Sequence, residues 1–283
     1  MALRIVTDSS CDLPAAVIRS LDITIVPCYI HFGDELLRDG VDIQPSKFYQ
    51  RLGSGGVHPT TSQPSVGDFL QVYQDLTAEG DEVLSVHISS KLSGTYNSAV
   101  QARKELPERP RIEVVDSLQV SLGLGIAAKA VAELARADGS MEQARAFLER
   151  ELPRIVCYVS VDTLGYLVRG GRASRIQGFL GSLLNIKPII VVRDGETHPV
   201  DRVRSRKRLL ARFQQIILSC SPVRTLGFLH SACPDEAQLL ADRSSADFPD
   251  AEVLISEFTP VLGVHLGPRA LGISIWSDAE SES

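Results

Sequence analysis

Short apolar runs alternate with amphipathic segments along nearly the whole chain of 283 residues. Alternation of strand patterns with helix patterns predicts an α/β fold built on a doubly wound, mostly parallel sheet. A polar break at 137–141 and a new apolar run from residue 155 indicate a second unit. We therefore expect two α/β domains, an N-terminal doubly wound domain over residues 1–154 and a C-terminal mixed-sheet domain over residues 155–283.

Several helix boundaries are readable in the same pattern. A helix is predicted from about Asp12, with Pro14 in its first turn, where proline is tolerated. The Gly/Ser/Thr/Pro-rich stretch 53–65 reads as a long loop that ends at Ser65. Asp68 follows three residues later, which is the spacing of a capping box. A Gly/Arg-rich helical segment is expected over residues 162–185.

Composition limits the classes of protein. Hydrophobic residues make up 44% and charged residues 23%, as in globular proteins, and a net charge of −6 argues against general binding of nucleic acid. The N-terminus shows no secretory signal pattern, and no uncharged apolar run is long enough for a membrane span. Five scattered cysteines without a C-x-x-C pair favour reduced thiols and a cytoplasmic location.

The segment 88–99, ISSKLSGTYNSA, places many hydroxyl groups where a strand pattern changes to a helix pattern. One helix cap uses only one hydroxyl, whereas this junction offers five: Ser89, Ser90, Ser93, Thr95 and Ser98. Neutral hydroxyls and the N–H groups of a helix N-terminus can hold an anion without a nearby cation. A clamp for a carboxylate with an apolar remainder fits this chemistry best, because a buried, uncompensated cation would be costly.

Other kinds of site have weaker support. A serine hydrolase acting through Ser93 remains an alternative, although the chain has no G-x-S-x-G motif and its six histidines are dispersed. A nucleotide site is disfavoured because Gly123 and Gly125 lack the third glycine of a dinucleotide fingerprint, and no phosphate-loop motif occurs. His230 and Cys233 alone have a ligand-like spacing, so neither a metal nor a cofactor is expected. A site for another small anion, such as a lipid phosphate, also remains open.

Two further segments carry unusual chemistry. His265 lies between two glycines in GVHLGP, in what reads as a loop, and an imidazole would suit a carboxylate partner. Residues 202–212 contain six basic side chains beside an apolar stripe. They form either a solvated amphipathic helix or a docking face for anionic lipid or an acidic partner.

Taken together, several motifs resemble the DegV family of bacterial fatty-acid-binding proteins, which serve a fatty-acid kinase. The resemblance covers nearly the full length in order. It rests on VTDSSCDLP (6–14), TSQPS (61–65), ISSKLSGTYNSA (88–99), VDS (115–117), DTLGYLVRGGR (162–172), LGSLLNIKPII (180–190) and GVHLGP (263–268).

The resemblance implies a long-chain fatty acid held in a cleft between two α/β domains. Its carboxylate would contact Thr61, Ser93 and His265, with Ser62 and Gly94 beside them. The chain would then be a lipid-binding carrier without catalytic activity. It would present the acid to a fatty-acid kinase catalytic subunit, which forms an acyl phosphate for phospholipid synthesis.

The chain departs from the family pattern at one position. Arg269 stands in GPRA, where the family typically has a small residue, as in GPGA. An arginine there could alter the head-group contacts or the surface that the kinase meets. Arg169 and Arg172 match the arginine-bearing stretch of the family, which suggests an interdomain or partner contact.

Overall fold

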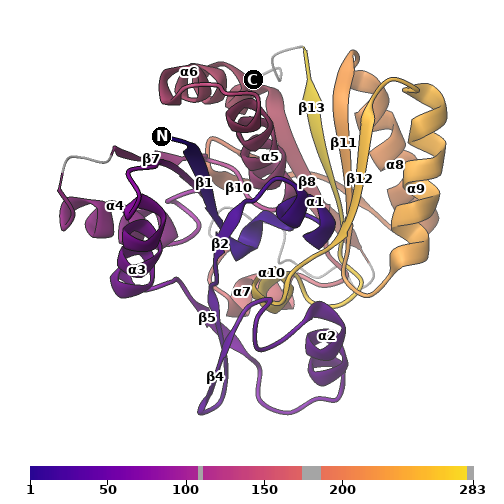
Figure 1. The fold of residues 1–283 in the computed structure, drawn as a ribbon. Coiled ribbons are helices and arrows are strands. Elements are labelled where there is room, and N and C mark those ends of the chain that lie inside the picture. The colour runs from indigo at the N-terminus through magenta and orange to yellow at the C-terminus, as the bar shows by residue number, and fades with distance from the viewer. Residues whose placement is uncertain (108–110, 174–185, 279–283) are drawn as a thin grey trace.

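The computed structural model describes residues 1–107, 111–173 and 186–278, and its first layer is a parallel four-stranded sheet (Figure 1). The strand order is β2-β1-β6-β7, with β1 (Leu3–Asp8), β2 (Thr24–Val26), β6 (Glu82–His87) and β7 (Ile112–Asp116). Helices α3 (Val66–Thr77) and α4 (Thr95–Lys104) pack on one face. Helix α5 (Leu122–Arg136), followed by α6 (Met141–Glu151), packs on β1 and β6 from the other.

The second layer is a mixed six-stranded sheet in the order β10-β9-β8-β13-β11-β12. Only β11 and β12 pair in parallel, and the other neighbours are antiparallel. The strands are β8 (Ile155–Ser160), β9 (Lys187–Arg193), β10 (Glu196–Val203), β11 (Val223–His230), β12 (Glu252–Glu257) and β13 (Leu271–Ser277). Helices α8 (Arg206–Ser219) and α9 (Pro234–Asp247) lie side by side along this sheet (Figure 1).

A small third sheet projects at the bottom of Figure 1. It is antiparallel, in the order β4-β3-β5, with β3 (Tyr29–Phe32), β4 (Glu35–Arg38) and β5 (Thr60–Ser62). Helix α2 (Pro45–Gly53) accompanies it and contacts α10 (Pro260–Leu266), which lies between β12 and β13 in sequence. The loop predicted over residues 53–65 therefore contains a short strand.

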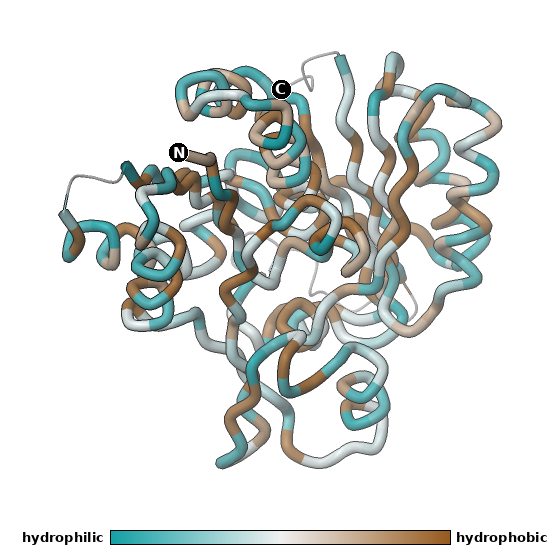
Figure 2. Tube along the Cα trace, viewed as in Figure 1, coloured by the Kyte–Doolittle hydropathy of each residue, from teal (hydrophilic) through white to brown (hydrophobic). Residues whose placement is uncertain are grey.

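Helix α5 joins the two large sheets, because it packs against β1 and β6 on one side and against β8 and β13 on the other. Its side chains belong to one apolar cluster that also contains Ile5, Leu84, Ile155 and Phe258. A Cβ at Gly125 would lie 2.4 Å from the carbonyl oxygen of Cys11, so only a glycine allows α5 to approach this closely. Figure 2 shows hydrophobic positions along the central strands and hydrophilic ones on the outer sides of α6 and α9.

The predicted α/β class, with a parallel N-terminal sheet and a mixed C-terminal sheet, is confirmed. The capping box at Ser65 and Asp68 is also confirmed. The helix predicted from about Asp12 is present as α1 (Ala15–Ser20), but it begins later than expected. Asp12 has a left-handed φ of 51°, and Pro14 is the N-cap residue and not part of the first turn. The two large sheets separate near the short 3-10 helix Leu152–Arg154, and the domain boundary at 154 stays a prediction.

Two C-terminal predictions need correction. Strand β10 was missed, because its half-exposed polar residues and Pro199 hide the pattern of an edge strand that carries a bulge. Residues 202–212 are not one helix, since β10 continues to Val203 and α8 begins at Arg206. Of the helix expected over 162–185, α7 (Gly165–Arg169) is present, and 174–185 lie outside the described residues.

Within the three described ranges, no helix combines the length and hydrophobicity that crossing a bilayer requires.

Candidate functional site

A mainly apolar cavity lies where the three sheets meet. The volume open to the centres of water molecules is about 110 Å³, well above the roughly 10–15 Å³ that one water needs. Both halves of the chain contribute apolar walls: Cys28, Ile88, Leu92, Val120, Cys157, Val159, Leu167, Val192, Phe258, Val261, Leu262 and Leu266. The cavity suits a ligand with a long apolar portion.

Thr61, Ser93 and His265 all line this cavity, although they are far apart in sequence. Thr61 is supplied by β5, Ser93 by the loop between β6 and α4, and His265 by α10. Thr61 Oγ1 and His265 Nε2 are 2.9 Å apart, across 204 residues of sequence. The structure therefore brings together the three residues that the sequence singled out.

His265 lies in helix α10, so its expected position in a loop was wrong. Only 9% of the residue is exposed. Burial, followed by the charge of Arg172 and by His58, lowers the pKa of His265 to about 4. The imidazole is consequently neutral at pH 7.

The neutral imidazole has one partner in the described protein, and its tautomer follows from that contact. Nδ1 of His265 is buried without a hydrogen bond there, and a Cβ at Gly170 would lie only 2.0 Å from it. A proton on Nδ1 would find no acceptor beside Gly170. We therefore place the proton on Nε2, which donates to Thr61 Oγ1. Thr61 can then donate its own hydroxyl proton into the cavity.

The hydrogen bonds of Ser93 also leave its hydroxyl proton available to a ligand. The N–H of Thr95 donates to Ser93 Oγ at 3.3 Å, and the two hydroxyl oxygens are 2.8 Å apart. When Thr95 is the donor of that second bond, Ser93 keeps its own proton for a ligand. Thr61 and Ser93 then present two O–H donors at one end of an apolar cavity.

Ser62 and Gly94 have different positions around this end. Ser62 lines the cavity, and its Oγ lies 2.9 Å from His31 Nε2. Gly94 is the N-cap residue of α4 and lines a neighbouring polar recess instead of the cavity. Gly94 offers no side chain to cap α4, and the first N–H of the helix, that of Thr95, donates to Ser93 Oγ instead.

Arg172 stands between the cavity and this recess, which sequence reasoning did not foresee in detail. It lines both spaces together with Leu92, Ser93 and Thr197. Its guanidinium donates to the carbonyls of Leu92 and Gly170, and burial lowers its pKa. A guanidinium remains charged at neutral pH, so a positive charge lies close to the two hydroxyls.

The hydrolase alternative receives no support from the geometry. Across the described part of the chain, no histidine forms a hydrogen bond with Ser93. A Ser85–His87–Asp8 chain does exist, with His87 Nε2 2.7 Å from Ser85 Oγ and Nδ1 3.0 Å from Asp8 Oδ2. All three residues are fully buried and lie outside the cavity lining, so this hydrogen-bonded triplet stabilises the core.

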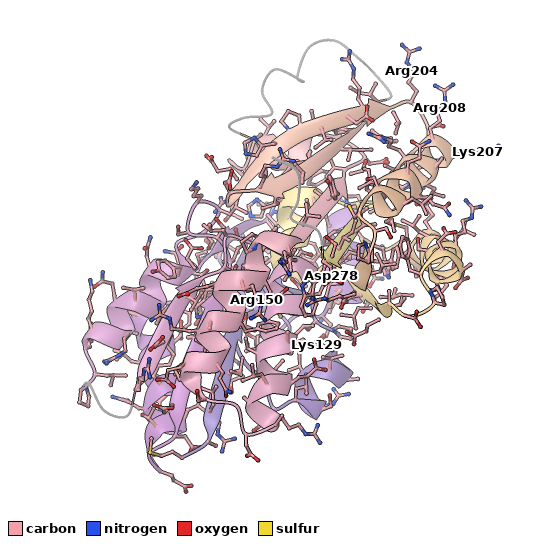
Figure 3. All side chains as sticks on the ribbon, turned by 90° about the horizontal axis from the view of Figure 1, so that it is seen from above. Lys129, Arg150, Arg204, Lys207, Arg208 and Asp278 are labelled. Atoms are coloured by element: carbon pink, nitrogen blue, oxygen red, sulfur yellow. The ribbon has the colours of Figure 1, made fainter. Side chains whose placement is uncertain are left out.

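Arg269 and most of the basic residues around the start of α8 lie on the surface. Arg269 forms an ion pair with Glu236 and lies outside the cavity lining, so the expected effect on head-group contacts is not seen. Arg204, just before α8, and Lys207 and Arg208, in its first turn, project together (Figure 3). Docking of a membrane or a partner there stays a prediction.

Within the described ranges, no group of three or more His, Cys, Asp or Glu side chains is placed to hold a metal ion.

Comparisons with known proteins agree with this architecture. A family model described as "Uncharacterised protein, DegV family" matches residues 2–278. A DegV domain-containing protein of Caldanaerobacter subterraneus is 35% identical over 277 residues, which cover 96% of this chain and 97% of that protein.

Solved structures show the same likeness. One describes fatty acid binding of a DegV family protein from Thermus thermophilus, with 36% identity, a TM-score of 0.91, and coverage of 98% of this chain and 100% of that one. DegV of Bacillus subtilis, described as a fatty acid binding protein, has 32% identity, a TM-score of 0.89, and coverage of 98% and 100%. The chain therefore belongs to the DegV family.

Proposed function

We propose that this protein binds one long-chain fatty acid, with the acyl chain in the apolar cavity and the carboxylate at Thr61, Ser93 and His265. The observation that carries the proposal is an apolar cavity that ends at two hydroxyl donors backed by a neutral imidazole. Relatives of similar structure from Thermus thermophilus and Bacillus subtilis are described as fatty-acid-binding proteins.

The carboxylate would accept the protons of Thr61 and Ser93, and the guanidinium of Arg172 would balance its charge. Ser62 and Gly94 extend this polar end as neighbours of Thr61 and Ser93. Charge-assisted hydrogen bonds of this kind orient the head group, while the apolar walls bind the chain by removing it from water.

The protein would act as a carrier without its own catalysis and present the acid to a fatty-acid kinase, which forms the acyl phosphate. The recess beside Ser93 supports this role, because it adjoins the carboxylate end and is lined by Lys91 and Arg172. A mixture of this protein, fatty acid and ATP should form no acyl phosphate until the kinase is added. Acyl phosphate formed without the kinase would overturn the carrier assignment.

Denaturing extraction followed by mass spectrometry tests the ligand directly. The purified protein should release about one long-chain fatty acid per chain, and delipidated protein should rebind palmitate. Hexadecanol, which has the same chain without a carboxylate, should bind more weakly because it cannot use the two donors as an anion does. A protein that is empty and also fails to bind added fatty acids contradicts the proposal.

A further inference from the structure

One wall of the cavity is a seam between two segments from different sheets. The first is the loop 88–94 that follows β6 of the parallel sheet, and the second is the β9–β10 hairpin of the mixed sheet. Ile88, Leu92 and Ser93 line the cavity from the loop. Val192 and Thr197 line it from the two strands of the hairpin.

The polar recess lies along the same seam. Residues 90–94 form one side of it, and Glu196 and Thr197 form another, with Arg172 between them. The cavity and the recess share the lining residues Leu92, Ser93, Arg172 and Thr197, so the same two segments border both spaces. A movement that separates the two segments would open a route between cavity and recess.

Two side chains of the loop donate hydrogen bonds to main-chain carbonyls in the turn of the hairpin. Ser89 Oγ donates to the carbonyl of Gly195 at 2.8 Å, and Lys91 Nζ donates to the carbonyl of Asp194 at 2.8 Å. Lys91 Nζ also lies 3.9 Å from Glu196 Oε2. No strand pairing between the loop and the hairpin occurs within the described residues, so these contacts can break without unzipping a sheet.

The turn fits closely against the loop. Gly195 has a φ of +77°, and a Cβ there would lie 2.4 Å from Ser89 Oγ and 3.1 Å from Leu118 Cδ2. Glycine supplies both the left-handed backbone and the room for this approach. The Lys91 side chain is 47% exposed, so one of the two bonds competes with water.

We propose that the contact of Ser89 and Lys91 with the turn at Asp194 and Gly195 is a latch that closes the cavity, and that its opening controls uptake and release of the bound lipid. This inference rests on the proposed fatty-acid function. Two side-chain hydrogen bonds, one of them made by a half-exposed lysine, suit a latch, since so few bonds stabilise the closed form while leaving the open form accessible at equilibrium.

A designed disulfide tests the latch. The Cβ built on Gly195 lies 3.4 Å from Ser89 Cβ, close to the roughly 3.5–4.5 Å found in disulfides. In the Ser89→Cys/Gly195→Cys variant, oxidation should slow the release of prebound fluorescent fatty acid by at least about tenfold, and reduction should restore it. The single variants Ser89→Cys and Gly195→Cys carry the same local changes and should not respond to oxidation. Equal release rates in the oxidised and reduced double variant would overturn the latch.

A second variant avoids the strain of a residue at position 195. Lys91→Ala removes one latch bond at a half-exposed side chain and should speed release by about 2- to 10-fold, the effect of losing one such hydrogen bond. Arg136→Ala is the matched control, because Arg136 Nη1 donates to the carbonyl of Ser20 at 3.0 Å outside the cavity lining. An unchanged rate in Lys91→Ala would contradict the latch.

The two hypotheses fail differently. Failure of the proposed function would appear as no fatty-acid binding by the reduced double variant, by wild type and by Arg136→Ala alike. Failure of the latch would appear as normal binding with release rates that neither oxidation nor Lys91→Ala changes.

Discussion

Replacing Thr61 by valine removes one hydroxyl group from the carboxylate end of the cavity and little else. Valine keeps the branched shape that suits strand β5, where Thr61 pairs with Ile30. The hydroxyl is lost both as the partner of His265 Nε2, 2.9 Å away, and as the donor assigned to the ligand.

The expected loss of affinity follows from those two roles. His265 Nε2 loses its partner in the free and the bound protein alike, so that loss lowers stability by about 1 kcal/mol and largely cancels in binding. The carboxylate loses one charge-assisted bond only in the complex, which costs about 1–3 kcal/mol. At about 1.4 kcal/mol per tenfold change, affinity for the acid should fall about 5- to 150-fold.

Displacement titration of delipidated protein measures this change, with palmitate and hexadecanol as paired ligands. The acid should lose affinity and the alcohol should lose much less, because its binding depends mainly on the apolar walls. Thr60→Val is the matched control: Thr60 is the preceding residue of β5 and is exposed, and successive side chains of a strand point to opposite faces.

Equal affinity of Thr61→Val and Thr60→Val for palmitate would refute the assignment of Thr61 to the carboxylate. An equal loss for palmitate and hexadecanol would also refute it, since that result would locate the effect in the apolar walls. Combining Thr61→Val with His265→Ala should cost less than the sum of the single changes, because the two residues act as one hydrogen-bonded unit.

Three further predictions concern packing, backbone strain and pH. Gly170→Ala puts a Cβ 2.0 Å from His265 Nδ1, and the displaced imidazole should lower palmitate affinity at least about tenfold in the same titration. Arg269 has a left-handed φ of 60°, which glycine adopts without strain. Arg269→Gly should therefore raise the free energy of unfolding in urea by about 0.5–1 kcal/mol, after the loss of the exposed ion pair with Glu236 is subtracted. Palmitate binding should be unchanged. Burial raises the pKa of Asp39 to about 8, above the roughly 3.9 of an unfolded aspartate. Wild type should therefore lose stability as the pH rises from about 4 to about 8, and Asp39→Asn should be more stable than wild type by about 1–3 kcal/mol at about pH 8.5 in urea unfolding. Equal pH profiles of the two proteins would contradict the last prediction.

Local chemistry was readable from the sequence where it depends on near neighbours. Hydrophobic period and turn residues predicted the α/β class and the alternation of strands with helices, because burial on a sheet imposes a regular pattern. The capping box at Ser65 needs only a serine and an acid three residues apart. Edge strand β10 escaped this reasoning, since its side chains are half exposed and lack a clear alternation.

The tertiary structure decided which of these local features act together. The sequence and its family resemblance singled out Thr61, Ser93 and His265, yet no local pattern could place a strand, a loop and a helix from three sheets around one cavity. Helix α10 turns His265 from an apparent loop residue into a buried neutral base. Its protonation depends on burial and on charges distant in sequence, such as Arg172. Long-range contacts create the low-dielectric surroundings of the site, and for that reason they lie beyond the reach of sequence pattern alone.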